Sequence, residues 1–221
     1  MPAERIDPDA EQAARQQLVR FGRRMVADGL VVGSAGNLSI RLGDAALITP
    51  TGVPYDDLAT TDMCLVSLLD GRRRGPGRPS SEFPMHRLIY SCTDAGAVVH
   101  THSTAAVAVS ITCAELPAVH YSILQLGGTT VRVAAYRTFG SDDLAASAVA
   151  ALEGRTGALL QNHGGITYGA DLAQAYLRAQ VLEWLSDIYL RSRAIGPPRL
   201  LSEEELAAVA ESARRRRYEG A

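Results

Sequence analysis

The apolar run Ala97–His102, which ends in two histidines, constrains the fold of this chain more than any other segment. Its short, β-branched sequence predicts a buried strand. In a strand, residues i and i+2 project from the same face with Cα atoms about 6.5–7 Å apart, so His100 and His102 point the same way. Both imidazoles can therefore reach one metal ion, because a zinc–nitrogen bond is about 2.0–2.1 Å long.

A third histidine, His163, follows the apolar run Ala158–Asn162 and precedes two glycines, which let the backbone approach a ligand closely. Two like-faced histidines on an apolar strand would be costly to bury without a shared ligand. Three neutral nitrogens without a thiolate leave one coordination position open, as is typical of catalytic zinc. We therefore predict that His100, His102 and His163 bind zinc, and we interpret His86 and His120 as hydrogen-bonded core or rim residues.

The basic residues restrict the chemistry, because all 22 of them are arginine and the chain has no lysine. Schiff-base catalysis, pyridoxal phosphate attachment and the P-loop are excluded, since each needs a lysine. Backbone amides, hydroxyls or arginine must then hold any phosphate. A net charge of −2 gives no electrostatic signature for nucleic acid or a membrane surface.

Length and cysteine content indicate the setting of the protein. With 221 residues, 47% of them hydrophobic, we expect a single domain over residues 1–221. Three cysteines without a CxxC pair, and a beginning without an apolar leader, predict a cytoplasmic protein. No run reaches the length of a membrane span.

Hydrophobic periodicity predicts helices and strands that do not alternate strictly. We expect helices over 11–30, 81–92, 103–110, 141–152, 172–193 and 202–217, strands over 37–41, 45–49, 61–69, 97–102, 130–133 and 158–162, and a loop over 71–79. Ser103 or Thr104 is expected to cap one helix, and Ser202 with Glu205 another. The pattern favours a three-layer α/β/α domain around a mixed, largely antiparallel sheet over a doubly wound fold.

Three segments rich in hydroxyl groups and glycine, namely Gly33–Asn37, Thr49–Gly52 and Pro79–Glu82, are candidates for phosphate binding. Each alone is an ordinary turn or cap, but beside three histidines they predict a phosphate site without lysine. Glu82, in the first turn of a predicted helix, is either a capping residue or a fourth metal ligand that becomes a general base when substrate displaces it. We interpret the arginine runs 72–74 and 214–217 as a solvated loop and a helix end.

Six motifs, in order, resemble those of the class II aldolase/adducin family. They begin at Gly33 (GSAGNLS), Ile48 (ITPTGxxY), Ser80 (SSExxxH), Val99 (VHTH), Pro117 (PAVHY) and Gln161 (QNHG). The resemblance covers about residues 10–210 and is nearest to the L-fuculose-1-phosphate aldolases.

The resemblance implies a zinc-dependent lyase of carbohydrate metabolism. Such an enzyme cleaves fuculose 1-phosphate, or a related deoxypentulose or pentulose 1-phosphate, to dihydroxyacetone phosphate and a small aldehyde through a metal-stabilised enediolate. It implies one Zn2+ per chain on the three histidines, with Glu82 as resting fourth ligand and acid/base. It also implies a C4 homotetramer with active sites at subunit interfaces. The implied phosphate-binding residues are Ser34, Gly36, Asn37, Thr51, Gly52, Ser80 and Ser81.

Three aromatic residues complete the implied site: Tyr121 as a second acid/base, and Phe139 and Tyr218 beside the aldehyde. Tyr218 is not in strict register with the family pattern, so the resemblance does not define the aldehyde specificity. Ser34 stands where threonine is more usual, a mild change that keeps the hydroxyl group. Pentulose-phosphate 4-epimerase, methylthioribulose-phosphate dehydratase and phospho-sugar-acid decarboxylase are alternatives within the family. The epimerases typically carry Ser-Ser-Asp at positions 80–82. An adducin-like binding module is the non-enzymatic alternative, which the intact histidines disfavour.

Overall fold

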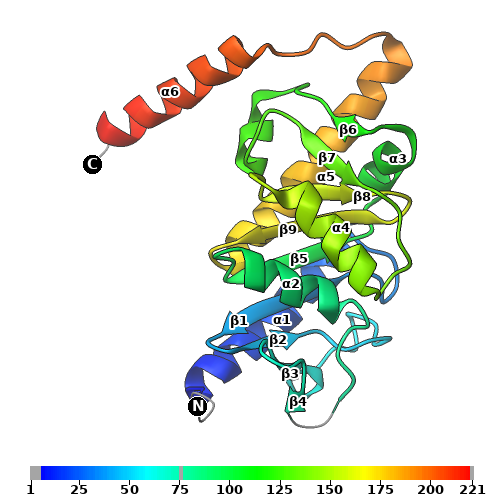
Figure 1. The fold of residues 1–221 in the computed structure, drawn as a ribbon, viewed down its shortest axis with the longest axis vertical. Coiled ribbons are helices and arrows are strands. Elements are labelled where there is room, and N and C mark those ends of the chain that lie inside the picture. The colour runs from blue at the N-terminus through cyan, green and yellow to red at the C-terminus, as the bar shows by residue number, and fades with distance from the viewer. Residues whose placement is uncertain (1–5, 75–76, 220–221) are drawn as a thin grey trace.

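The computed structural model describes residues 6–74 and 77–219, with backbone only for 217–219. Within these residues, one sheet has the strand order β4-β3-β2-β1-β5-β9-β8-β7-β6 (Figure 1). Neighbouring strands are antiparallel except β7 and β8, which are parallel. The strands are β1 (Asn37–Leu42), β2 (Ala45–Ile48), β3 (Cys64–Ser67), β4 (Arg73–Arg74), β5 (Ala97–Thr101), β6 (Glu115–Leu116), β7 (Val131–Ala134), β8 (Gly157–Leu160) and β9 (Gly164–Gly169).

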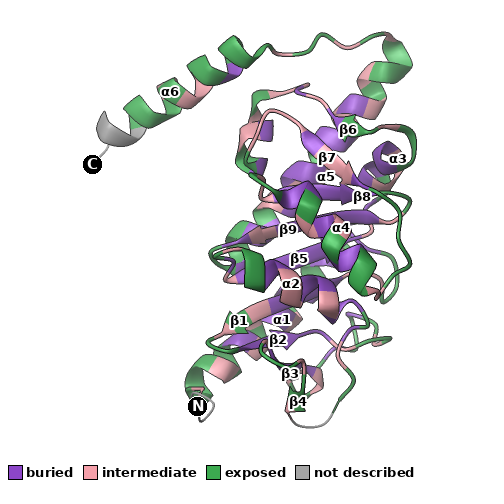
Figure 2. Cartoon of the chain, in the orientation of Figure 1, coloured by how far each residue is buried: buried purple, intermediate pink, exposed green. Residues whose placement is uncertain are grey.

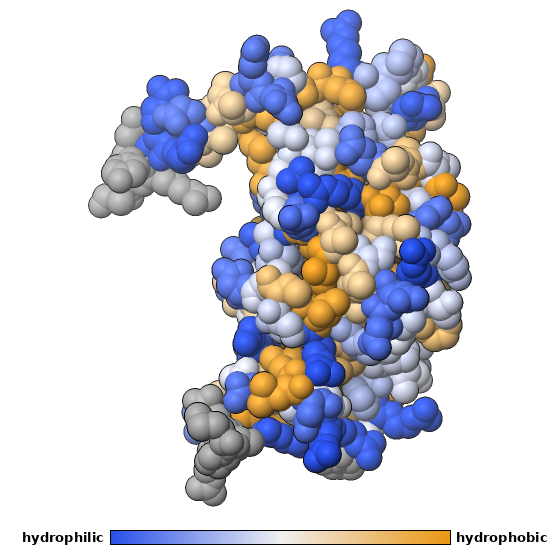
Figure 3. Space-filling view, in the orientation of Figure 1, coloured by the Kyte–Doolittle hydropathy of each residue, from blue (hydrophilic) through white to orange (hydrophobic). Residues whose placement is uncertain are grey.

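Helices cover both faces of this sheet, which confirms the predicted layers. One face packs against α1 (Pro8–Ala27), α3 (Thr104–Thr112) and α5 (Leu172–Ile195), and the other against α2 (Phe83–Cys92) and α4 (Asp142–Leu152). Two short 3-10 helices, η1 (Thr60–Asp62) and η2 (Tyr121–Leu126), lie in connections. The last helix, α6 (Glu203–Glu219), extends away from the body, and the space-filling view shows a hollow beneath it (Figure 3).

The central strand β5 is buried on both faces, as its continuous apolar sequence predicts (Figure 2). Val99 belongs to the core beneath α1 and α5, whereas Val98 belongs to the core beneath α2 and α4. Since side chains alternate along a strand, His100 follows Val98 toward α2. The fold thus directs the end of β5 toward the N-terminus of α2, where Glu82 lies.

Several elements differ from the sequence predictions. The strand expected over 61–69 is shorter, because η1 occupies its beginning and β3 covers only Cys64–Ser67, and Arg73–Arg74 forms a short edge strand inside the expected loop. Neither β6 nor β9 was predicted. Strand β9 contains three glycines, which weaken the strand signal. The structure needs one of them, because a Cβ on Gly164 would lie 2.0 Å from the carbonyl oxygen of Thr101 in β5.

Helix capping follows the sequence in one case and departs from it in another. The capping box of α6 is confirmed, since the amide of Ser202 donates to Glu205 and the amide of Glu205 donates to Ser202 Oγ. At α3 the N-cap is Ser103, yet its hydroxyl makes no capping bond. Glu183 in α5 instead accepts hydrogen bonds from the amides of residues 105 and 106.

None of the helices in the described ranges combines the length and apolarity needed to cross a bilayer.

Candidate metal centre and its cavity

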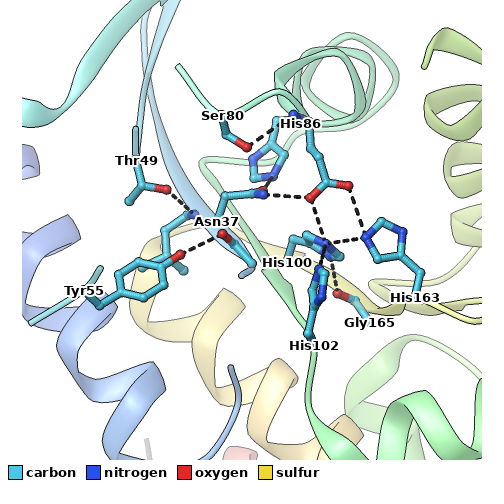
Figure 4. A network of polar contacts seen from close by, with 12 residues as sticks. Asn37, Thr49, Tyr55, Ser80, His86, His100, His102, His163 and Gly165 are labelled. Carbon is cyan, nitrogen blue, oxygen red and sulfur yellow. Dashed lines mark hydrogen bonds and ion pairs between the residues drawn. The ribbon is translucent and has the colours of Figure 1, made fainter. Parts of the chain in front are cut away.

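Three histidines converge where strand β5 ends beside the turn between β8 and β9 (Figure 4). His100 is in β5, His102 directly follows that strand, and His163 lies in the turn between β8 and β9. The Nε2 atom of His100 is 2.9 Å from that of His102 and 3.2 Å from that of His163. The structure therefore brings together the three residues that the sequence predicts as ligands.

Backbone geometry presents His163 to the other two rings. Asn162 adopts a φ of 56°, in the left-handed region that asparagine tolerates better than most residues. Gly164 then allows β9 to approach β5 closely. His100 Nδ1 lies 2.9 Å from the carbonyl oxygen of Gly165, to which it donates, so its Nε2 lone pair faces the cluster.

Glu82 completes the cluster from the other side. It is the N-cap residue of α2, and its side chain makes no capping hydrogen bond, so the interpretation of Glu82 as a plain capping residue is wrong. Its Oε2 lies 3.0 Å from His100 Nε2, and its Oε1 lies 3.2 Å from His163 Nε2. The carboxylate is buried and faces two of the three imidazoles.

The four side chains fit a zinc ion. One ligand atom from each of Glu82, His100, His102 and His163 lies within 4.8 Å of the others. Tetrahedral coordination with bonds of about 2.0–2.1 Å would separate ligand atoms by about 3.3 Å, close to the spacings here. Within the described chain, buried Glu82 Oε1 has no hydrogen-bond partner. A central cation would satisfy this oxygen and the facing imidazole nitrogens together.

The electrostatics of the cluster also favour a cation. Burial lowers the pKa of His102 to about 3, and the charges of His100 and His163 add to this effect. Burial alone would raise the pKa of Glu82, but His100 and His163 outweigh it and hold that pKa far below its usual value. Burial likewise disfavours charge on His100, yet Glu82 raises the pKa of this imidazole. Glu82 is therefore ionised and His102 neutral, which are the protonation states in which these groups bind a cation.

A cavity of about 310 Å³ opens beside Glu82, His102 and His163. Pro50 and Pro79 pair in a β-bridge, and the amide of Thr51 donates to the carbonyl of Arg78 at 3.0 Å, which joins the second and third hydroxyl-rich segments. All of the residues predicted to bind phosphate line this cavity: Ser34, Gly36, Asn37, Thr51, Gly52, Ser80 and Ser81.

The aromatic residues implied by the resemblance are distributed differently. Phe139 lines the cavity and is 67% exposed. Tyr121 does not line it; this residue begins η2, is 51% exposed and borders a groove with Leu177 and Val209. The backbone of Tyr218 belongs to α6, but its side chain lies outside the described residues.

Three residues that the sequence reasoning missed also line the cavity: Tyr136, Arg137 and Asn162. Asn162 precedes a predicted ligand, and its position in a tight turn is a signal that could have identified it. Tyr136 and Arg137 lie in the β7–α4 connection, where no periodicity marks a functional side chain. Arg72 is exposed, as predicted, and pairs with Asp70 at 3.4 Å, although Arg73–Arg74 forms β4 and not a loop. In the last helix the side chains of Arg214, Arg215 and Arg216 are exposed.

Known proteins are similar to this chain in sequence and in fold. The family model "Class II Aldolase and Adducin N-terminal domain" matches residues 16–190. A 5-methylthioribulose-1-phosphate/5-deoxyribulose-1-phosphate aldolase of Rhodospirillum rubrum is 39% identical over 205 residues, 92% of each chain. An L-fuculose phosphate aldolase of Escherichia coli K12 is 39% identical over 198 residues, 89% of this chain and 92% of that one. A solved L-fuculose 1-phosphate aldolase superposes with a TM-score of 0.87 at 33% identity, covering 91% of this chain and 96% of that chain.

Proposed function

The chain belongs to the class II aldolase and adducin family, and from this membership and the cavity we propose that it is a single-domain, cytoplasmic, zinc-dependent aldolase. Its reaction is cleavage of a ketose 1-phosphate to dihydroxyacetone phosphate and a small aldehyde. The observation that carries this proposal is the joining of two features in one cavity. A histidine–glutamate cluster suited to zinc lies beside the seven hydroxyl- and amide-bearing residues suited to a phosphate.

The cluster suits carbon–carbon bond cleavage because its groups can hold charge and move a proton. Bound zinc would polarise the C2 carbonyl and stabilise the negative charge that develops across C2 and C3. During synthesis, ionised Glu82 removes the C3 proton through Oε1, which has no hydrogen-bond partner in the described structure, and the Tyr121 hydroxyl donates its proton to the alkoxide that forms at C4. Cleavage is the reverse: the Tyr121 phenolate takes the proton of the C4 hydroxyl, protonated Glu82 gives its proton to C3, and proton exchange with solvent restores the starting states.

The test is to load the purified protein with zinc and offer dihydroxyacetone phosphate with a panel of aldehydes. Acetaldehyde, lactaldehyde, glycolaldehyde and methylthioacetaldehyde correspond to the substrates in the names of the relatives or to close pentulose analogues. We expect condensation that a chelator abolishes and that added zinc restores. The His100→Ala variant should lose both metal and turnover. Full activity in the metal-stripped protein would overturn the proposal.

Phosphate recognition is proposed to depend on neutral donors. Ser81→Ala should raise KM for the ketose 1-phosphate by about tenfold or more, because a hydrogen bond to a charged group contributes about 1.5–3 kcal/mol. Arg72→Ala is the matched control, since Arg72 is solvated and does not line the cavity. If Ser81→Ala leaves KM unchanged while Arg137→Ala raises it, the arginine holds the phosphate instead.

A C4 homotetramer with shared active sites is the proposed assembly. Tyr121 is exposed, and it borders the groove formed by η2, α5 and α6 rather than the cavity of its own chain. Its proposed role therefore requires a neighbouring subunit to supply it. Light scattering of the purified protein tests the assembly, and a monomer with full activity would exclude this role for Tyr121.

A further inference from the structure

A chain of buried polar side chains joins α2 to β1 and ends on Glu82. Glu82, His86 and Tyr90 are spaced four residues apart and so share one side of the α2 segment. Asn37 and Ser39 are two residues apart and share one face of β1. The spacings match, because four residues of helix rise about 6 Å and two residues of strand about 6.7 Å. The side chains therefore interleave along the helix–strand contact.

The hydrogen bonds alternate between the two elements, and Figure 4 shows the part of this network around Asn37 and His86. Asn37 Nδ2 donates to Glu82 Oε2 at 2.9 Å, and Asn37 Oδ1 lies 2.5 Å from His86 Nε2. His86 Nδ1 lies 2.7 Å from Ser39 Oγ, which lies 2.7 Å from the Tyr90 hydroxyl. All five side chains are buried, and His86 and Ser39 are fully inaccessible to solvent.

The carboxylate of Glu82 fixes the direction of each bond. An ionised carboxylate only accepts, so Asn37 turns its amide nitrogen toward it and its carbonyl oxygen toward His86. Asn37 Oδ1 also only accepts, so the neutral His86 ring carries its proton on Nε2, and its Nδ1 is an acceptor. Ser39 then donates to Nδ1 and accepts from Tyr90. Reversing the Asn37 or His86 bond would place two acceptors or two donors face to face in a buried site.

We propose that His86 is a positioning residue for proton transfer at Glu82. Its neutral ring, held by Ser39, keeps Asn37 in the orientation that donates to Oε2, and this leaves Oε1 to exchange the proton. His86 does not line the cavity, so it acts through Asn37 and not on the substrate. The inference rests on the proposed role of Glu82 as the group that transfers the proton.

A matched pair of variants tests this role in the zinc-loaded enzyme. His86→Gln keeps an amide donor near the Nε2 position, whereas His86→Asn is too short to reach Asn37. We expect His86→Asn to lower kcat by about 10- to 100-fold, the usual effect of losing such a supporting group, with KM for the ketose 1-phosphate little changed. His86→Gln should recover most of the loss. Equal losses in both variants, or a loss confined to KM, would overturn the proposal.

The tautomer provides a measurement independent of turnover. Long-range ¹H–¹⁵N correlation spectra of histidine-labelled, zinc-loaded wild type should show His86 protonated on Nε2, and protonation on Nδ1 would overturn the proposal even if His86→Asn does not fold. Ser39→Ala, which removes the donor to Nδ1, should lower kcat in the same direction as His86→Asn. An inactive wild type would overturn the proposed function itself. If the wild type is active but His86→Asn and His86→Gln lose the same share of kcat, only the role of His86 would be overturned.

Discussion

The two oxygens of Glu82 lie in different surroundings. Oε2 accepts from Asn37 and lies 3.0 Å from His100 Nε2, whereas Oε1 lies 3.2 Å from His163 Nε2 and accepts no hydrogen bond from a described residue. A carboxylate in this position can remain anchored through one oxygen while the other binds a cation or a proton. One residue can thereby act as both ligand and base.

Replacing Glu82 by glutamine tests this double role. An amide cannot accept the proton, so Glu82→Gln should slow exchange of the C3 proton of dihydroxyacetone phosphate with solvent by about 10²- to 10⁴-fold, the usual contribution of a general base. Zinc content and the unfolding temperature should change little. The exchange is followed by NMR in deuterated buffer, with the surface variant Glu204→Gln as control. Exchange at the wild-type rate would assign the base to another group.

Two histidines, the fully buried His86 and the half-buried His102, predict the pH dependence of stability in the metal-free protein. Burial lowers the pKa of His86 to about 3, and that of His102 is also about 3, from an ordinary value of 6.5. Below pH 6.5 these two imidazoles therefore bind protons in the unfolded chain but remain neutral in the native state. The free energy of unfolding should fall by about 1.4 kcal/mol per pH unit for each histidine as the pH drops from 6.5 toward 3.

Neighbouring groups do not cancel this slope above pH 4.5. Since the pKa of His100 is raised, the stability that His100 contributes is constant below pH 6.5 and adds no slope there. The lowered pKa of Glu82 changes the free energy of unfolding only below pH 4.5, the ordinary pKa of a glutamate. Urea unfolding at pH 7, 6 and 5 measures the slope. His86→Gln should remove about half of it. A free energy of unfolding that is flat across this range would contradict the predicted neutrality of both rings.

At the scale of elements, α3 depends on a residue outside itself. Glu183 in α5 accepts the amides of Ala105 and Ala106 at 2.9 and 2.8 Å, whereas the buried hydroxyl of Ser103 has no partner among the described residues. Glu183→Ala should lower the free energy of unfolding by about 1.5–3 kcal/mol, since these bonds involve a charged group. Ser103→Ala should cost much less. Thermal or urea unfolding compares the two variants, and a larger loss for Ser103→Ala would contradict this assignment of the cap.

The same helix shows what the sequence can and cannot predict. Ser103 was correctly expected at the N-terminus of α3, because capping preferences are local. The capping of α3 by Glu183 instead of the Ser103 hydroxyl was not predictable, because that carboxylate lies 78 positions from Ala105. The candidate metal ligands and candidate phosphate-binding residues were predicted from short motifs, each complete within a few positions, and the structure places them around one cavity. Tyr136 and Arg137 were missed, because only the three-dimensional fold brings their connection beside the cavity.

For the whole molecule, the shared site predicts complementation between inactive subunits. In the proposed tetramer, each active site combines Glu82 of one subunit with Tyr121 of a neighbouring subunit, so Glu82→Gln and Tyr121→Phe remove groups that lie in different chains of the same site. Each variant alone should be weakly active, but an equal mixture with exchanged subunits should recover about a quarter of the wild-type activity, since random pairing gives that share of intact sites. The assay is aldehyde condensation after joint unfolding and refolding. Mixtures no more active than the separate variants would place both groups in one chain.

The connection between β7 and α4 supplies Tyr136, Arg137 and Phe139 to the cavity, yet its fixed contacts involve mainly its backbone. The amide of Tyr136 donates to Gln161 Oε1 at 3.0 Å, and the amide of Ser141 donates to the carbonyl of residue 138. The side chains at 136, 137 and 139 are exposed and can change without loss of these bonds. Randomising these three positions should therefore produce a library of folded catalysts, from which selection could isolate variants that join dihydroxyacetone phosphate to aldehydes outside the natural repertoire.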